Sequence, residues 1–234
     1  MSLSPEDRLI VALDVPTLAE AERIVGALGD AASIFKIGYQ LFPIGGFDFA
    51  QRLRAAGKGV FIDAKLFDIG ATVERGVASL RGIAATFLTV HADPDTLKGA
   101  VAGRGDSDLK ILAVTVLTSW NADMLRTHGI DRPVDDLVLF RAEMAAENGA
   151  DGVIASAAEA RRIKARFGDR LEIITPGIRP AGADAHDQKR VVTPADAISA
   201  GADRLVVGRP IVSAAEPAVA ARSLLSEIAA VAAR

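Results

Sequence analysis

Cysteine is absent from the 234 residues of the chain, and this absence excludes disulfide bonds, thiolate metal sites and cysteine nucleophiles. Long apolar runs are absent as well. The longest stretch without a charged residue or histidine, residues 111–122, has twelve residues, whereas a membrane-spanning helix needs about 20. Residues 1–8 are polar and contain no apolar core of a signal peptide. We therefore expect a cytoplasmic location and no membrane partner.

Charge of one sign is not in excess, because the chain has 27 basic and 30 acidic side chains and a net charge of −3. Nucleic-acid binding without sequence preference needs clustered lysine and arginine. Here the two signs alternate along nearly every segment. The sequence therefore predicts no nucleic-acid partner.

Short motifs for metal binding and nucleophilic catalysis are also missing. The sequence contains no HExxH, no GxSxG, no Walker A motif and no GxGxxG after the first expected strand. Asp93 closely follows His91, but the three histidines lie far apart in sequence, and a lone histidine at a strand end is more often structural than a ligand. We expect no bound metal and no cofactor.

Hydrophobic residues make up 50% of the chain and form eight short, β-rich runs separated by stretches of helical period. The runs are residues 9–13, 34–37, 60–64, 86–90, 111–116, 152–155, 171–175 and 205–207. Each is nearly continuously apolar, as expected of a strand covered on both faces. Eight such β/α units predict a single (β/α)8 TIM-barrel domain over residues 1–234, with a doubly wound open sheet as the alternative.

Two of the helical stretches carry clear boundary signals. Thr17 and Glu20 have the spacing of a capping box, and Gly29 follows the last apolar position of the same stretch. Thr193 followed by Pro194 is typical of an N-cap and a first helical residue. These signals predict helices that begin after residues 17 and 193.

Polar residues gather at the ends of the expected strands: Asp14, Lys36, Asp63, Lys65, His91, Thr118, Ser156, Arg179 and Arg209. In a (β/α)8 barrel, the loops after the carboxyl ends of the strands build the active site. These residues are therefore candidates for a site at that face.

The segment from Asp63 to Asp68 is the densest of these features. On an extended strand, side chains two residues apart point to the same side, so Asp63 and Lys65 should enter the barrel mouth together. Charges just beyond a strand are usually solvated loop residues. Three charges of alternating sign in six residues instead favour a site in which carboxylates flank a desolvated ammonium.

Lys36 is unusual because it interrupts a run that otherwise reads as a buried strand. Lysine is almost never fully buried without a partner. Lys36 is either a strand residue whose ammonium reaches the rim or a partner of Asp63 on the neighbouring strand. Asp14 is likewise either a helix cap before Pro16 or a polar group at a strand end.

The last two β/α units carry a signal for phosphate binding. Pro176 opens a loop that contains Arg179 and Gln188, and Gly208 and Arg209 end the last expected strand. Barrels commonly bind phosphate through the loops after strands 7 and 8, and backbone N–H groups beside an arginine suit a phosphate dianion. The long loop from residue 177 to residue 191 could act as a lid.

Six motifs together resemble those of a known family: Ala12-Leu13-Asp14, Phe35-Lys36-Ile37-Gly38, Asp63-Ala64-Lys65-Leu66-Phe67-Asp68-Ile69 with Thr72, Val116-Leu117-Thr118-Ser119, Thr175-Pro176-Gly177-Ile178-Arg179-Pro180, and Val207-Gly208-Arg209-Pro210-Ile211. The chain resembles the orotidine 5′-monophosphate decarboxylase family in its bacterial form. The motifs run in family order from residue 12 to residue 211, so the resemblance covers essentially the whole chain. One departure is the segment 92–95, where the bacterial family often has a small, glycine-rich turn.

The resemblance implies a cofactor-free decarboxylation of orotidine 5′-monophosphate to uridine 5′-monophosphate. Lys65 would stabilise the developing C6 carbanion and protonate it as CO₂ departs. Asp63 would lie beside the substrate carboxylate, either destabilising it or positioning Lys65. Lys36 and Asp68 would complete an alternating chain of charges.

The resemblance also implies substrate contacts and a homodimer. Asp68, Ile69 and Thr72 would act in the partner's site across the dimer interface. The remaining contacts would come from Asp14 and Lys36 to the ribose, Thr118 to the base, and Pro176, Arg179, Gln188, Gly208 and Arg209 around the loops that bind the phosphate.

Two alternative functions predict different experimental results. Related hexulose-phosphate synthases and ketogulonate-phosphate decarboxylases share the Asp-x-Lys-x-x-Asp spacing but use a glutamate with Mg²⁺ at the second strand, where this chain has Lys36. Such an enzyme would be inhibited by EDTA. A catalytically inactive barrel would bind a nucleotide or phosphosugar without turnover.

Overall fold

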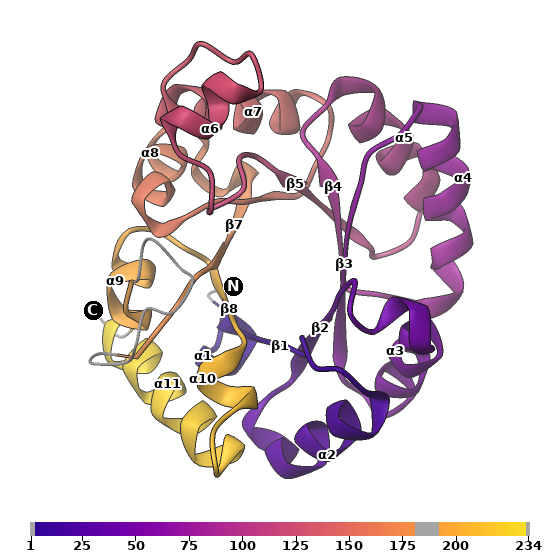
Figure 1. Cartoon of the computed structure of the whole chain (residues 1–234), viewed down its shortest axis with the longest axis vertical. Helices are drawn as coiled ribbons and strands as arrows, with labels where there is room; N and C mark the ends of the chain where they lie inside the picture. The colour runs from indigo at the N-terminus through magenta and orange to yellow at the C-terminus, as the bar shows by residue number, and fades with distance from the viewer. Residues whose placement is uncertain (1–2, 181–191, 233–234) are drawn as a thin grey trace.

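Eight parallel strands form a closed barrel in the computed structural model, which describes residues 3–180 and 192–232 (Figure 1). The strands follow one another around the barrel in chain order, and the first pairs with the last. They are β1 (Leu9–Ala12), β2 (Ile34–Ile37), β3 (Gly59–Leu66), β4 (Phe87–His91), β5 (Lys110–Val114), β6 (Gly152–Ile154), β7 (Glu172–Pro176) and β8 (Arg204–Val207). The barrel prediction is confirmed, and the open-sheet alternative is wrong.

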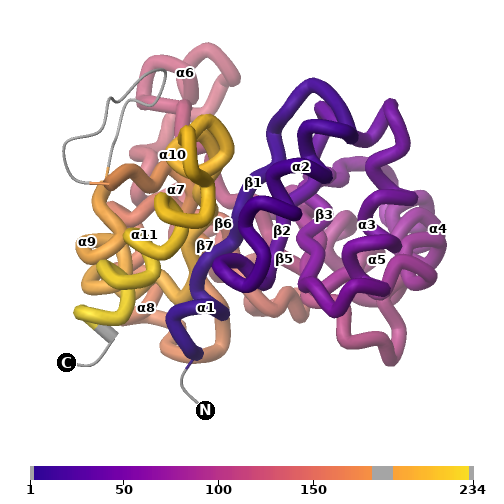
Figure 2. The backbone as a smooth tube through the Cα atoms, turned by 90° about the horizontal axis from the view of Figure 1, so that it is seen from below, coloured from indigo at the N-terminus to yellow at the C-terminus, as the bar shows by residue number. Residues whose placement is uncertain are grey.

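Helices surround the strands in Figure 1. They are α1 (Pro5–Arg8), α2 (Leu18–Leu28), α3 (Gly46–Ala55), α4 (Gly70–Leu80), α5 (Pro94–Arg104), α6 (Ala122–Thr127), α7 (Val134–Glu147), α8 (Ala157–Phe167), α9 (Pro194–Ser199), α10 (Arg209–Val212) and α11 (Pro217–Ala232). Figure 2 shows α6 and α10, which follow strands, at the end of the barrel away from the chain termini. Within the described residues, no helix combines the length and the apolar character needed to cross a membrane.

The predicted helix starts are confirmed. The Thr17 hydroxyl accepts a hydrogen bond from the backbone N–H of Glu20, and Thr193 caps α9 in the same way. Gly29 ends α2 with φ at +52°, a conformation that favours glycine. Because Thr17 caps α2, Asp14 is not the cap of this helix.

The apolar core has two layers. Side chains such as Ile10, Phe61 and Ile174 fill the inside of the barrel, while a larger set packs between the strands and the helices. Helices α4 and α5 lie especially close together. A Cβ at Gly99 of α5 would be only 2.3 Å from the backbone oxygen of Gly70, so only glycine fits at this position. Because Gly70 is the first residue of α4, this close approach lies at the start of that helix.

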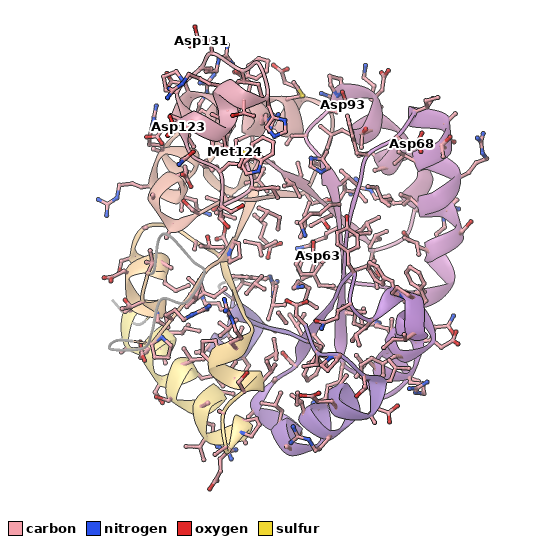
Figure 3. All side chains as sticks on the ribbon, in the orientation of Figure 1. Asp63, Asp68, Asp93, Asp123, Met124 and Asp131 are labelled. Atoms are coloured by element: carbon pink, nitrogen blue, oxygen red, sulfur yellow. The ribbon has the colours of Figure 1, made fainter. Side chains whose placement is uncertain are left out.

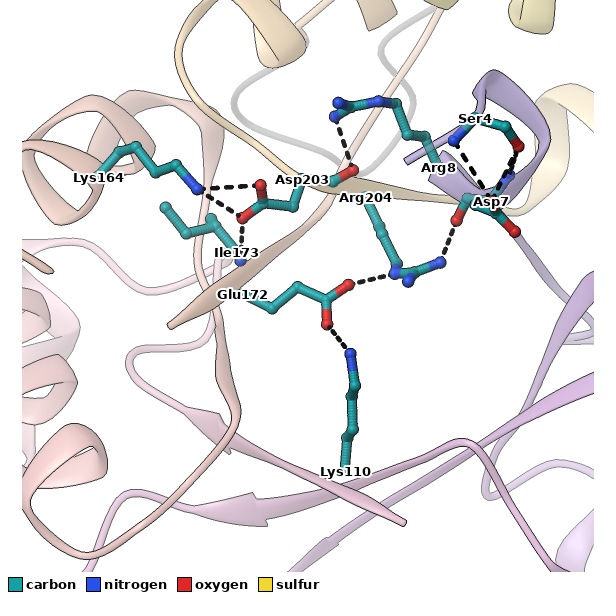
Figure 4. A network of polar contacts seen from close by, with 9 residues as sticks. All are labelled: Ser4, Asp7, Arg8, Lys110, Lys164, Glu172, Ile173, Asp203 and Arg204. Carbon is teal, nitrogen blue, oxygen red and sulfur yellow. Dashed lines mark hydrogen bonds and ion pairs between the residues drawn. The ribbon is translucent and has the colours of Figure 1, made fainter. Parts of the chain in front are cut away.

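Charged residues close the amino-terminal end of the barrel (Figure 4). The Glu172 carboxylate binds the Nε of Arg204, and it lies 2.8 Å from the Nζ of Lys110. Both cations lie over the ring of Phe87, and Arg204 also donates to the backbone oxygen of Asp7. Burial opposes ionisation of Glu172, but Arg204 and Lys110 outweigh it and lower the pKa of this carboxyl.

Replacing Glu172 by glutamine should lower the free energy of unfolding by roughly 3 kcal/mol, because the buried Arg204 guanidinium would lose its carboxylate. Urea denaturation at neutral pH measures this change. The difference from the wild type should shrink as the pH falls, since a carboxyl with a lowered pKa loses its stabilising effect when it is protonated.

The matched control is Lys110→Ala. The Lys110 side chain is 44% exposed, and an exposed ion pair contributes about 1 kcal/mol or less. An equal loss of stability in the two variants would contradict the proposed importance of the buried Arg204–Glu172 pair.

Candidate active site

A cavity of about 450 Å³ opens at the carboxyl ends of the strands. Its walls include nine of the site residues predicted from the sequence: Asp14, Lys36, Asp63, Lys65, Thr118, Pro176, Arg179, Gly208 and Arg209. Apolar side chains from the barrel interior, among them Phe61 and Ile154, line it too. The structure therefore brings together residues that are up to 195 positions apart in sequence, from Asp14 to Arg209.

Four charged groups of alternating sign lie in a row in this cavity. The Nζ of Lys36 is 2.9 Å from the Oδ1 of Asp14 and 3.2 Å from the Oδ2 of Asp63. The Nζ of Lys65 is 2.7 Å from the Oδ1 of Asp63. Lys36 therefore pairs with Asp63 and is almost fully buried, which favours a partner of Asp63 over a strand residue whose ammonium reaches the rim.

The ion pairs keep the central groups charged although they are buried. Burial opposes ionisation of Asp63, but the ammonium groups of Lys36 and Lys65 outweigh it and lower the pKa of the carboxyl. For Lys36, burial acts against the charged form, and Asp63 and Asp14 outweigh it and raise the pKa of the ammonium. Lys36 and Asp63 therefore favour their charged forms near neutral pH.

The end of β3 is irregular, which the sequence did not suggest. The pairing of β3 with β4 shifts register between Ile62 and Leu66. Lys65 adopts a left-handed backbone with φ at +45°, a conformation that costs a residue with a side chain on the order of 1–3 kcal/mol. Asp63 and Lys65 do meet in the cavity, but the regular two-residue alternation of an extended strand does not by itself describe their placement.

Two residues around this row of charges, Thr89 and Tyr39, were missed by the sequence analysis. Thr89 is fully buried on β4, and its hydroxyl lies 3.0 Å from the backbone nitrogen of Lys65. Tyr39 lies with its ring 5.7 Å from the Nζ of Lys65. Gly38 lies beside the Lys36–Asp14 pair, and a Cβ there would be 3.4 Å from the Nζ of Lys36. The available signal for Thr89 was a hydroxyl side chain inside the otherwise apolar stretch 87–90.

Asp68, Ile69 and Thr72 lie outside the cavity. Figure 3 shows Asp63 near the centre of the barrel and Asp68 beside the outer helices α4 and α5. The Asp68 carboxylate accepts a hydrogen bond from the backbone N–H of Ile69, and Ile69 is 75% exposed. Among the ion pairs of the described residues, none joins Asp68 to Lys65 of the same chain.

The ends of β7 and β8 supply the positive side of the cavity opposite β3. Arg179 is almost fully buried, and its backbone N–H donates to the oxygen of Val192 at 3.0 Å. Arg209 begins α10 directly after Gly208. Gln188 and the predicted lid, except for residues 177–180, lie outside the described residues.

Among the described residues, His91 and Asp93 do not form a metal site with other side chains. The Asp93 carboxylate caps α5 by accepting from the backbone N–H of Thr96. Burial, then the charges of Arg141 and Lys65, lower the pKa of His91. In the part of the chain that the structure describes, no group of three or more potential ligands is arranged to hold a metal ion.

The closed (β/α)8 barrel carries carboxylate-bound ammonium groups and two arginines at the carboxyl ends of its strands, the face at which enzymes of this fold have their active sites. Its sequence supports a narrower assignment. The chain belongs to the orotidine 5′-phosphate decarboxylase / HUMPS family, whose model matches residues 7–224.

Individual relatives agree with this assignment over nearly the full length. The orotidine 5′-phosphate decarboxylase of Methylorubrum populi is 55% identical over 227 residues, which cover 97% of each chain. That of Rhodopseudomonas palustris is 54% identical and covers 95% of this chain and 94% of the relative. The crystal structure of orotidine 5′-phosphate decarboxylase from Lactobacillus acidophilus is 37% identical with a TM-score of 0.83, covering 94% of this chain and 98% of that chain.

Proposed function

We propose that the protein converts orotidine 5′-monophosphate to uridine 5′-monophosphate and CO₂ without a metal or cofactor. The observation that carries this proposal is the position of Lys65, whose ammonium is held by Asp63 at the wall of the cavity. Full-length similarity to relatives named for this activity supports the choice of substrate.

In the proposed reaction, the bond between C6 of the pyrimidine and the carboxylate carbon breaks, and its electron pair stays on C6. The ring offers this carbanion no resonance, so stabilisation must come from a nearby positive charge. The Lys65 ammonium supplies that charge and donates its proton to C6, while CO₂ leaves. Because Asp63 fixes the ammonium beforehand, little reorganisation is needed in the transition state.

The rest of the cavity matches the remaining parts of the substrate. Asp14 and Lys36, which are 2.9 Å apart, would bind the ribose hydroxyls, and Thr118 would contact the base. Pro176, Arg179, Gly208 and Arg209 also line the cavity and would bind the phosphate, with Gln188 proposed as a further contact. Binding the distant phosphate holds C6 against Lys65, which lowers the barrier there.

We further propose that the enzyme is a homodimer in which Asp68, Ile69 and Thr72 reach into the partner's site. The loop before α4 supports this arrangement, because Phe67 and Ile69 are 69% and 75% exposed. Exposed apolar side chains that cluster are typical of a protein interface. A partner's Asp68 would add a second carboxylate beside Lys65.

A decarboxylase assay with EDTA present tests the reaction and the metal independence together. We expect loss of the ultraviolet absorbance of orotidine 5′-monophosphate, release of CO₂, and the same rate with or without EDTA. Activity on a ketose phosphate only after Mg²⁺ is restored would instead assign the chain to the metal-dependent relatives. Binding of uridine 5′-monophosphate without any turnover would indicate an inactive barrel.

A further inference from the structure

The peptide unit between Ala64 and Lys65 is held at both of its polar atoms by side chains. The Tyr39 hydroxyl donates to the oxygen of Ala64 at 2.8 Å, and the N–H of Lys65 donates to the Oγ1 of Thr89 at 3.0 Å. This peptide lies where the β3–β4 register shifts. Two side chains thus provide the hydrogen bonds of this peptide in place of the regular bonds between neighbouring strands.

The same Thr89 hydroxyl also contacts the charged groups of the site. It donates to the Oδ1 of Asp63 at 2.9 Å, the oxygen that lies 2.7 Å from the Nζ of Lys65. Thr89 has no exposed surface, so water does not compete for these bonds. One hydroxyl therefore connects the backbone of Lys65 with the carboxylate that holds its side chain.

We propose that Tyr39 and Thr89 are positioning residues that hold the left-handed backbone of Lys65 and thereby direct its ammonium to Asp63. This inference rests on the proposed role of Lys65 in proton transfer. A residue with a Cβ leaves the left-handed region readily unless its surroundings hold it there. If either hydroxyl is removed, the segment is free to relax toward an ordinary strand, and the Nζ moves away from C6 of the substrate.

The first test is Thr89→Val, which keeps the shape of the side chain and removes the hydroxyl. We expect kcat for orotidine 5′-monophosphate to fall about a hundredfold, since a displacement of about 1 Å at a reacting group can cost this much. The affinity for uridine 5′-monophosphate should change less than about twofold, because the phosphate and ribose contacts come from other strands. Thr89→Ser, which retains the hydroxyl, should restore most of kcat.

The matched control is Thr115→Val. Thr115 is also a fully buried threonine, and its hydroxyl donates to the oxygen of Ile154 at 2.8 Å, outside the row of charges. This variant should lose a similar amount of thermal stability but keep kcat within about twofold of the wild type. Equal losses of kcat in Thr89→Val and Thr115→Val would overturn the proposal, as would failure of Thr89→Ser to restore kcat.

Tyr39→Phe gives an independent test at an exposed side chain, where folding is not at risk. We expect kcat to fall about tenfold, and the double variant Tyr39→Phe/Thr89→Val to lose less than the product of the two single effects, because both act on one peptide. Unchanged kcat in Tyr39→Phe would overturn the part assigned to Tyr39. A Lys65→Ala enzyme that retained turnover would instead refute the role of Lys65, which distinguishes failure of the proposed function from failure of this inference.

Discussion

Replacement of Lys65 by alanine should reduce kcat/KM for orotidine 5′-monophosphate by about 10⁴-fold or more. The variant would lose the proton donor, a contribution of about 10²–10⁴-fold, and the positive charge beside C6, which is worth a further 10²–10³-fold or so. Steady-state kinetics with the ultraviolet assay measures the change. The affinity for uridine 5′-monophosphate should remain measurable, because Arg179 and Arg209 still line the cavity.

Lys110→Ala is the control for loss of a lysine. Lys110 lies at the amino-terminal end of the barrel, opposite the cavity, and its ammonium pairs with Glu172. Turnover should therefore be unchanged in this variant. If Lys65→Ala retained most of the wild-type kcat/KM, the role of Lys65 as proton donor would be wrong.

The barrel was predictable because its signals are local. Continuous apolar runs indicated the strands, and residues such as Thr17 and Gly29 indicated helix ends. Several strand boundaries were less accurate where charged residues occupy the strands. β5 and β8 begin at Lys110 and Arg204, but the predicted strands began one residue later because these two side chains are charged. In the structure, both form ion pairs with Glu172 of β7, so they can occupy a strand. An ion pair between residues that are tens of positions apart leaves no periodic signal in the sequence.

The site was predictable in composition but not in detail. Lys36 in an apolar run indicated a buried pair, and the neighbouring strand offered Asp63, which is the partner in the structure. The left-handed backbone of Lys65 and its contact with Thr89 follow from a register shift in the barrel, and nothing in the local sequence marks that shift. The hydroxyl of Tyr39, which follows β2, reaches the backbone oxygen of Ala64 in β3, and this contact is likewise a tertiary effect.

Asp68→Ala should lower kcat/KM by about 10²–10³-fold if the carboxylate acts beside Lys65 across a dimer interface. Residues that act in trans can be identified with mixed dimers. In a dimer of one Lys65→Ala chain and one Asp68→Ala chain, one site would combine the intact Lys65 with the intact Asp68 of the partner. The other site would lack both groups.

Such a mixed dimer, isolated by co-expression with two different affinity tags, should therefore have about half of the wild-type activity per dimer, although both parent variants are nearly inactive. The mirror control pairs a wild-type chain with a Lys65→Ala/Asp68→Ala chain. If Asp68 acts in trans, each site of this dimer lacks at least one group, and the dimer should be nearly inactive. An inactive first dimer together with a half-active control would instead place Asp68 in the active site of its own chain. In the structure, the Asp68 carboxylate accepts a hydrogen bond from the N–H of Ile69 and lies outside the cavity of its own chain.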